Sequence, residues 1–349
     1  MKLSTLLRIR LANLPTPLQE LPNLSEELGP RILVKRDDLT GLAFGGNKAR
    51  KLEYLMGDAV DKGADYIITG AGFHSNWCAQ TAAAARRLGM KVSLVKKGPR
   101  DGYDPEDYDG NHLLHKLLGA DIRVVRPENF DKTMAEIEEV AKSDGYRTYT
   151  MGIGGSNPIG ASGYVNCMLE LVAQSVEKGI DIDYVVHASG SGGTQAGLVV
   201  GAKAFNSGIR VVGISTGSSS SEELTDKIAR IANETFEFLE IDANCTGEDI
   251  IVFDQYAGED YGFMTEGKAE AVQMLAQKEG LFLDPVYTGS AMWGLISLCR
   301  EGFFKREDTI IFLHTGGPVA LFPYRETLKA HIRGEPLPWV IPEWSPRAG

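Results

Sequence analysis

Residues 34–55 read VKRDDLTGLAFGGNKARKLEYL, and this stretch contains a complete change from strand to helix. The passage begins as a strand and continues through a glycine-containing loop. Leu52 and Leu55 then share one face of a helix, and Asn47 or its neighbour is a suitable cap for it. The pattern therefore predicts that Lys48 lies in the first turn of a helix that follows a strand.

A lysine in that position has unusual chemistry. The positive end of the helix dipole lowers the pKa of its amine and favours the neutral nucleophile that imine formation requires. The alternative is that Lys48, Arg50 and Lys51 form a solvated basic patch. The motif on its own leaves both interpretations open.

Outward from this passage, short β-branched runs alternate with longer helical patterns. The runs are YIITG from Tyr66, KVSLV from Lys91, IRVV from Ile122, YVVHAS from Tyr184, RVVGIS from Arg210 and TIIFLHTGG from Thr309. This alternation predicts an α/β fold with a mainly parallel sheet and helices on both faces. Several runs end in glycine or a small polar residue, at the strand ends where such folds bind ligands.

Composition narrows the class of protein. The chain has 349 residues, a net charge of -11 and 43% hydrophobic residues, enough for two cores but without a basic field for nucleic acid. It lacks the roughly 20 uninterrupted apolar residues of a membrane span. The apolar start is interrupted by Arg8 and Arg10, so we expect no signal peptide and a cytoplasmic location. The four scattered cysteines have no metal-ligand spacing, and we expect unpaired buried thiols.

Polar residues crowd one expected helix start in ITGAGFHSNWCAQTAAAARRLGM, residues 68–90. Ser75 or Asn76 can cap the helix through a side-chain oxygen. Capping does not explain why His74 and Gln80 join them. The group could instead hold a carboxylate and a ring hydroxyl.

A second helix start follows a strand in ASGSGGTQAGL, residues 188–198. Its turn, formed by Ser191, Gly192, Gly193 and Thr194, has the bare backbone that can wrap an anion. It matches neither a Walker loop nor a dinucleotide motif. A purely structural turn is the alternative, but the position between strand and helix favours phosphate.

Two later passages place further candidates at element ends. LDPVYTGSAMWGL, residues 283–295, puts Tyr287 and Thr288 just before a small-residue helix start. FLHTGGPVALF, residues 312–322, puts Thr315 at a strand terminus. Each is an ordinary turn on its own, but both could face the same crevice.

Taken together and in this order, the passages resemble the family of D-cysteine desulfhydrases and 1-aminocyclopropane-1-carboxylate (ACC) deaminases. The matching stretches are KRDDLTGLAFGGNKARKLEYL, SNWCAQTAAAARRLG, GGSNPIGASGY, SGSGGTQAGL, YAGEDYGF, EGLFLDPVYTGSAMWGLI and HTGG. The resemblance implies a fold type II pyridoxal 5'-phosphate (PLP) enzyme with two open, mainly parallel twisted sheets, flanking helices and PLP in the crevice between domains. It also implies a homodimer. We expect residues 1–48 and 164–349 to form the large PLP-binding domain and residues 49–163 the small one.

The resemblance also implies roles for the candidates. Lys48 would carry the cofactor, Asn76 would meet the ring hydroxyl, and the turn from Ser191 to Thr194 would hold the phosphate. Ser75 would meet the substrate carboxylate or act near its Cα. Tyr261 and Tyr287 would line the reacting end.

Two positions distinguish the branches of the family. ACC deaminases have Glu and Leu where this chain has Thr288 and Thr315. A carboxylate beside the pyridine nitrogen keeps it protonated and strengthens the electron sink, whereas a threonine hydroxyl supports that charge much less. Because β-elimination of a good leaving group needs a weaker sink than ring opening, both positions favour D-cysteine as substrate, giving pyruvate, ammonia and hydrogen sulfide.

One departure affects the substrate. The family commonly has QSNH where this chain has HSNW, so His74 could hold a carboxylate or sulfonate while Trp77 fills core space. An L-cysteate sulfo-lyase that releases sulfite is the nearest alternative, and ACC deaminase is third. A PLP-binding regulatory module without turnover is the alternative from another class.

Overall fold

The computed structural model describes residues 1–106, 108–217, 219–259 and 261–338. Its strands are β1 (Leu18–Glu20), β2 (Arg31–Lys35), β3 (Tyr66–Gly72), β4 (Lys91–Lys97), β5 (Asp121–Val125), β6 (Thr148–Met151), β7 (Tyr184–Ser189), β8 (Arg210–Ser215), β9 (Ile251–Phe253) and β10 (Thr309–Leu313). Its α-helices are α1 (Pro22–Leu28), α2 (Lys48–Asp61), α3 (Asn76–Arg87), α4 (Gly110–Leu117), α5 (Phe130–Ser143), α6 (Pro158–Lys178), α7 (Gly193–Ala204), α8 (Ser221–Phe238), α9 (Glu266–Glu279), α10 (Thr288–Arg300) and α11 (Arg325–Arg333). Short 3-10 helices are η1 (Leu3–Thr5), η2 (Asp37–Thr40), η3 (Leu42–Phe44), η4 (Pro127–Asn129), η5 (Ile153–Gly155), η6 (Gly247–Asp249) and η7 (Pro318–Tyr324).

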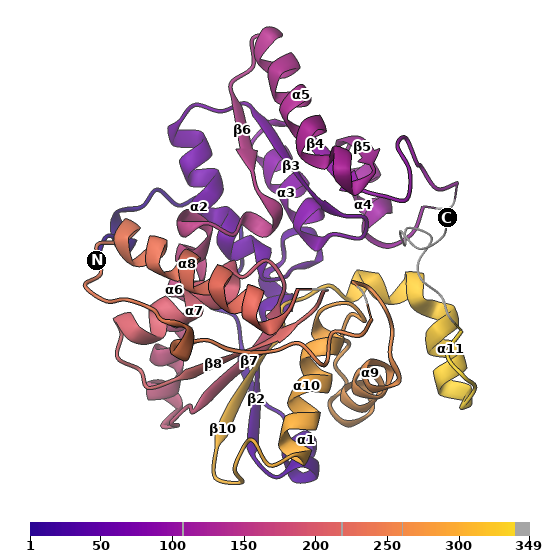
Figure 1. Ribbon diagram of the computed structural model, residues 1–349. Coiled ribbons are helices and arrows are strands. Elements are labelled where there is room, and N and C mark those ends of the chain that lie inside the picture. Colours follow the sequence, from indigo (N-terminus) through magenta and orange to yellow (C-terminus); the bar gives the residue numbers. More distant parts are fainter. Residues whose placement is uncertain (107, 218, 260, 339–349) are drawn as a thin grey trace.

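The strands form two sheets, one above the other in Figure 1. The larger has the order β1-β2-β10-β7-β8-β9, and the smaller has the order β5-β4-β3-β6. All neighbouring pairs are parallel except β1 with β2. The predicted α/β class with two mainly parallel sheets is confirmed.

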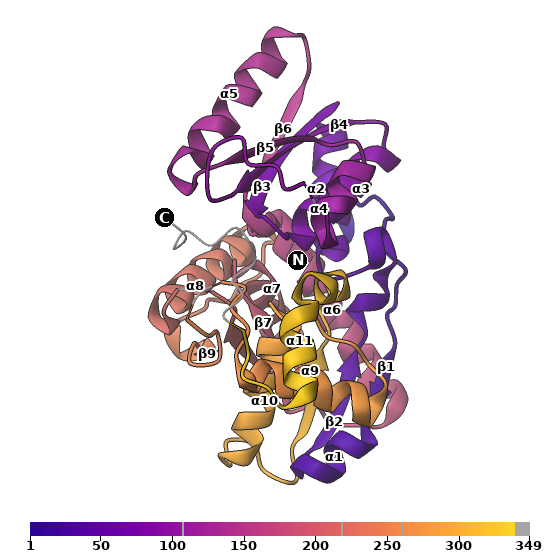
Figure 2. The same ribbon diagram turned by 90° about the vertical axis from the view of Figure 1, so that its right-hand side faces the viewer.

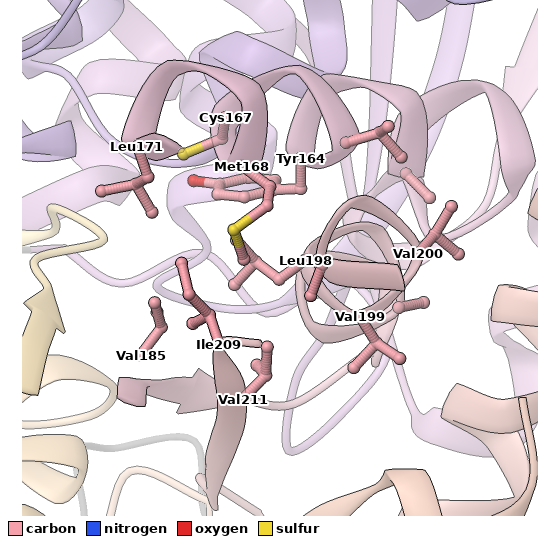
Figure 3. Close-up of a cluster of buried hydrophobic side chains, with 14 of the residues drawn as sticks. Tyr164, Cys167, Met168, Leu171, Val185, Leu198, Val199, Val200, Ile209 and Val211 are labelled. Carbon is pink, nitrogen blue, oxygen red and sulfur yellow. The ribbon is translucent and has the colours of Figure 1, made fainter. Parts of the chain in front are cut away.

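Helices cover both faces of the larger sheet. On one face, α6, α7 and α8 share an apolar cluster with strand residues such as Val185 and Val211; Figure 3 shows how Met168 of α6 meets Leu198 of α7 above them. On the opposite face, α1, α9 and α10 pack against alternate residues such as Val186 and Val212. Because both faces of the sheet are covered, β7 and β8 each have two consecutive buried valines, Val185–Val186 and Val211–Val212.

The smaller sheet is covered in the same way. Helices α2 and α3 bury Leu52 and the alanines of α3 against Ile67 and Leu94 on one face. Helix α5 covers the other face, where Phe130 and Met134 meet Ile68 and Val95. Figure 2 shows α5 on the outer side of this sheet.

The strands of the smaller sheet fall between residues 66 and 151, inside the predicted small domain of residues 49–163. The exact domain boundaries stay a prediction. All four cysteines are free, as expected, although Cys299 is only partly buried. Among the described residues, the chain forms no helix with the length and apolar character needed to cross a membrane.

Candidate active site

A cavity of about 490 Å³ lies at the carboxyl ends of strands from both sheets. Residues at the ends of β3, β4, β7 and β8 line it, as does the segment that follows β10. The lining residues that sequence analysis singled out are Lys48, Ser75, Asn76, Trp77, Ser191, Gly192, Thr194, Tyr261, Tyr287 and Thr315. Positions far apart in the chain therefore meet in one space, as expected for parallel sheets.

Lys48 begins α2 and reaches this cavity because of the tight loop before it. The hydroxyl of Thr40 accepts a hydrogen bond from the Gly46 amide at 2.7 Å. Gly45 has φ +80°, and a Cβ there would lie 1.9 Å from the carbonyl oxygen of Asp38, so only glycine fits. The first residue of α2, Lys48, thus lies at the wall of the cavity.

The Lys48 amine is suited to nucleophilic chemistry. Within the described part of the chain it has no hydrogen-bond or ion-pair partner, and it is accessible through the cavity. Burial lowers its pKa to about 8. At pH 7 about a tenth of the amine is therefore neutral. The neutral amine is the form that attacks a carbonyl.

The solvated basic patch proposed as an alternative is wrong for the two neighbours of Lys48. Arg50 is 1% exposed and donates to both carboxylate oxygens of Asp37 at 2.8 Å. Lys51 is fully buried and donates to the carbonyl of Gly154 at 3.1 Å and to the Ser156 hydroxyl at 3.5 Å. Burial together with the nearby Lys48 holds the pKa of Lys51 well below its usual value.

Ser75 and Asn76 form the start of α3, as predicted. The Ser75 hydroxyl caps the helix by accepting from the Cys78 amide at 3.3 Å. The Asn76 side-chain oxygen accepts from Asn111 at 2.6 Å, and its amide nitrogen has no partner among the described residues. A free N–H donor therefore borders the cavity.

His74 and Trp77 have different surroundings. His74 is not among the residues that line the cavity, so the expected contact with a substrate anion has no support there. Burial and the nearby Lys96 lower the pKa of His74 to about 3. Trp77 fills core space, as sequence analysis suggested, and its ring nitrogen donates to the Thr69 hydroxyl at 2.8 Å.

The turn from Ser191 to Thr194 connects β7 to α7. Gly192 is left-handed at φ +86° and precedes the first helical residue, Gly193. A Cβ on Gly193 would meet Ser156 at 2.7 Å, so this residue faces Ser156 rather than the cavity. Apart from the Gly193 amide, which donates to Ser156, the amides in the first turn of this 12-residue helix are the donors available to an anion.

Ser156 is a component that sequence analysis missed. Its hydroxyl donates to the Ser191 hydroxyl at 2.7 Å and accepts from the Gly193 amide at 3.2 Å. Lys51 also donates to the Ser156 hydroxyl, so a buried amine stabilises the residue that holds the Ser191–Thr194 turn. The glycine-rich passage that contains Ser156 was the available signal, but nothing in it indicates the distant partners.

Tyr261 and Tyr287 meet in the cavity, where their hydroxyl groups are hydrogen-bonded to each other. Burial raises the pKa of both hydroxyls, so both stay protonated. One phenol of the pair can donate a proton, and the other can then supply it with a new one.

Thr288 does not line the cavity, although its neighbour Tyr287 does. Its hydroxyl and amide both bond to the carboxylate of Asp284, at 2.7 and 2.9 Å. These bonds fix Thr288 at the start of α10, and its expected contact with a cofactor stays a prediction. Thr315 does line the cavity, and its carbonyl accepts from the Asn47 amide at 3.0 Å.

Comparison with known proteins shows which family the chain belongs to. The family model described as "Pyridoxal-phosphate dependent enzyme" matches residues 9–316. The chain belongs to this family. Its members use pyridoxal phosphate, so the family assignment confirms the expected cofactor.

Two similar relatives of this pyridoxal-phosphate dependent enzyme have different names. It is 41% identical over 324 residues to a "Putative 1-aminocyclopropane-1-carboxylate deaminase" of Pyrococcus horikoshii, covering 92% of this chain and 95% of the relative. It is also 41% identical over 326 residues to a "D-cysteine desulfhydrase" of Klebsiella pneumoniae, strain 342, covering 92% and 97%. Identity alone does not choose between them.

Solved structures agree with the fold. The structure described as an "ACC deaminase homologue" has a TM-score of 0.85 and 39% identity, covering 94% of this chain and 97% of that one. A threonine deaminase isoform of Solanum lycopersicum has a TM-score of 0.62 at 18% identity, covering 86% and 79%, and shares the fold.

The residues of this pyridoxal-phosphate dependent enzyme fit its cofactor. The cavity contains an amine without a competing partner, helix-start amides beside a left-handed glycine, and a free amide donor at Asn76. These groups match an aldehyde, a phosphate and a ring hydroxyl.

Proposed function

We propose that the protein catalyses β-elimination from D-cysteine, giving pyruvate, ammonia and hydrogen sulfide. One observation carries the proposal: no aspartate or glutamate is among the described residues that line the cavity. Thr315 lines it, where the resemblance gives ACC deaminases a leucine. A cavity without a carboxylate offers little support for a protonated pyridine nitrogen, so it favours elimination over ring opening.

Each cavity residue has a proposed role. Lys48 carries the cofactor, the Ser191–Thr194 turn holds its phosphate, and the free amide nitrogen of Asn76 donates to the ring oxygen. When bound, pyridoxal phosphate supplies an electron sink for the charge that develops at the substrate Cα.

The protein's own groups move the protons. Lys48 removes the Cα proton, because burial leaves a substantial fraction of its amine neutral near neutral pH. Ser75 binds the substrate carboxylate or acts near Cα. Tyr287 protonates the departing sulfur, and Tyr261 stabilises Tyr287 through their shared hydrogen bond.

Product analysis with four substrates tests this proposal. Pyruvate and sulfide from D-cysteine are expected, with little turnover of L-cysteine, L-cysteate or ACC. Sulfite from L-cysteate, or a four-carbon oxo acid from ACC, as the dominant product would replace D-cysteine as substrate. Cofactor binding without turnover of any of these would instead favour a regulatory module.

The proposed assembly rests on the resemblance, and the proposed location rests on the apolar start that Arg8 and Arg10 interrupt. We propose a homodimer in the cytoplasm that binds a small amino acid. Light scattering of the purified protein tests the first point, because a dimer has twice the 37.9 kDa mass of the chain.

A further inference from the structure

A buried line of hydrogen bonds connects the protein surface to the start of α3. Asp104 accepts from His112 at 3.0 Å, and the other ring nitrogen of His112 lies 2.8 Å from the Lys96 amine. Lys96 also lies 3.1 Å from His115, whose second ring nitrogen is 3.2 Å from the Ser75 carbonyl. Lys96, His112 and His115 are each at most 1% exposed, and none lines the cavity.

Acceptors at the two ends of this line determine where its protons lie. The Ser75 carbonyl and the Asp104 carboxylate only accept, so His115 and His112 carry their protons on Nε2. Each Nδ1 is then an acceptor for Lys96, which donates to both rings and lies 4.0 Å from the centre of the Phe73 ring. Every contact is satisfied by this one arrangement, which makes the network rigid.

The histidines remain neutral in this network. Burial lowers the pKa of His112 to about 4 and holds that of His115 well below its usual value. Near neutral pH both Nδ1 atoms therefore keep the lone pair that accepts from Lys96.

Helix α4, which contains His112 and His115, contacts the start of α3 a second time. The side-chain nitrogen of Asn111 donates to the His74 carbonyl at 2.9 Å and to the Asn76 side-chain oxygen at 2.6 Å. Helix α4 therefore holds three consecutive residues, 74 to 76. Because Asn111 occupies the oxygen of Asn76, the amide nitrogen is the end left for a ligand in the cavity.

We propose that α4 is a positioning element for the active site. Asn111 sets the direction of the Asn76 amide, and His115, held by Lys96, fixes the Ser75 backbone. None of these residues touches substrate or cofactor. The inference rests on the proposed roles of Ser75 and Asn76 and adds residues that decide how well those roles are performed.

Asn111→Asp is the sharpest test because it preserves size while removing the donor. An aspartate there accepts from the Asn76 nitrogen, which turns the Asn76 oxygen toward the cavity. Affinity for pyridoxal phosphate should fall about tenfold, because one hydrogen bond becomes a repulsive contact. Affinity for 3-deoxypyridoxal phosphate, which lacks the ring hydroxyl, should stay close to that of the unmodified protein.

The measurement is equilibrium titration of the full-length protein, stripped of cofactor, with each of the two compounds. Leu117→Ala is the matched control, because Leu117 lies on α4 and is 73% exposed. An equal loss for both compounds in Asn111→Asp would reduce α4 to a structural role, and no loss would end the proposal. The readout is independent of the amino-acid substrate, so a failed D-cysteine assay leaves this result unaffected.

His115 provides a second variant should the first fold poorly. His115→Leu removes the donor to the Ser75 carbonyl and should raise KM for D-cysteine about tenfold. His115→Gln keeps a side-chain N–H donor and should restore most of that loss. Equal defects in both variants, at equal thermal stability, would contradict positioning through this hydrogen bond.

Discussion

The residue that governs cofactor attachment is Lys48, and its surroundings predict a pH dependence. Its pKa is lowered to about 8, and only the neutral amine attacks an aldehyde. Below about pH 8 the neutral fraction, and therefore the rate of attachment, rises about tenfold per pH unit; above it the rate levels off.

Stopped-flow absorbance of the imine band after mixing the stripped protein with pyridoxal phosphate measures this rate. Lys48→Ala is the control and should give no imine band. A rate that keeps rising to about pH 10, as for an ordinary lysine, would contradict the lowered pKa of Lys48.

The Tyr261–Tyr287 pair predicts a dependence on the leaving group. Tyr287→Phe should slow sulfide release from D-cysteine about 100-fold, because a departing thiolate benefits from a proton. β-Chloro-D-alanine should be affected little, because chloride leaves without one.

Tyr256→Phe is a suitable control for this comparison. Tyr256 is also buried, but its hydroxyl contacts Glu301 at 3.3 Å and the residue does not line the cavity. Equal slowing of both substrates by Tyr287→Phe would assign Tyr287 a role other than proton donation.

At the level of single residues, sequence analysis located Lys48, Ser75 and Asn76 correctly at helix starts, because strand ends and caps have local signals. The contact of Thr288 with a cofactor stays a prediction. The cap residue Tyr287 lines the cavity, whereas Thr288, the first residue of α10, is fully buried and bonds to Asp284. The contacts of Lys96, His112 and His115 have no local pattern, because they join residues of different elements.

Among the elements, the loop from Ala257 to Phe263 depends on one buried lysine of α9. Lys268 is fully buried and donates to the carbonyl oxygens of both end residues, at 2.7 Å to Phe263. Lys268→Met should lower the free energy of unfolding by about 1–3 kcal/mol, because it removes the Lys268 hydrogen bond to the buried Ala257 carbonyl and a second one to the part-buried Phe263 carbonyl. Denaturant unfolding measures this loss.

Hydrogen exchange adds a local measurement for the same variant. Amides of residues 256–259 and 261–264 should exchange faster in Lys268→Met, whereas those of α2 should not. Lys278→Met, on the same helix with a more exposed ion pair to Glu27, should behave like the unmodified protein. Unchanged exchange in the loop would show that Lys268 does not restrain it.

The sequence predicted the longer strands and missed three short ones. Strands β1, β6 and β9 have only three or four residues each, too few for an alternating pattern. They form because an existing sheet edge offers hydrogen-bond partners. Such partners are supplied by distant parts of the chain and leave no trace in the local sequence.

For the molecule as a whole, a buried ionic cluster joins η2, α2 and α6. Arg50 bonds to Asp37, as described above, and to Glu170 at 2.9 and 3.0 Å. Burial alone would raise the pKa of both carboxyls, but the cation holds both below their usual values. Their contribution to stability is therefore present above about pH 4 and is lost as the pH falls further.

Without Arg50, the dependence of stability on pH should be reversed. Arg50→Met should cost about 3–5 kcal/mol near neutral pH, because it leaves the buried Asp37 carboxylate without its ion-pair partner and leaves Glu170 paired with Lys35 alone. The deficit should shrink toward about pH 4, where Asp37 takes up a proton and the unpaired charge disappears. Urea unfolding at several pH values measures this change.

The control for this experiment is Arg230→Met, which removes an exposed pair with Glu234 on α8. It should cost about 0–1 kcal/mol at every pH. A deficit in Arg50→Met that grows on acidification would contradict the assigned charge states.

The order of strands in the larger sheet has a consequence for synthesis of the chain. Strand β10 lies between β2 and β7, and its Ile310 is paired with Ile32 and Tyr184. A growing polypeptide that has not yet reached β10 therefore has two apolar strands with open edges, which attract chaperones or other nascent chains. The smaller sheet is built from consecutive segments and can form while the ribosome is still translating. The cofactor cavity, which needs both sheets, is completed only after β10 has been made.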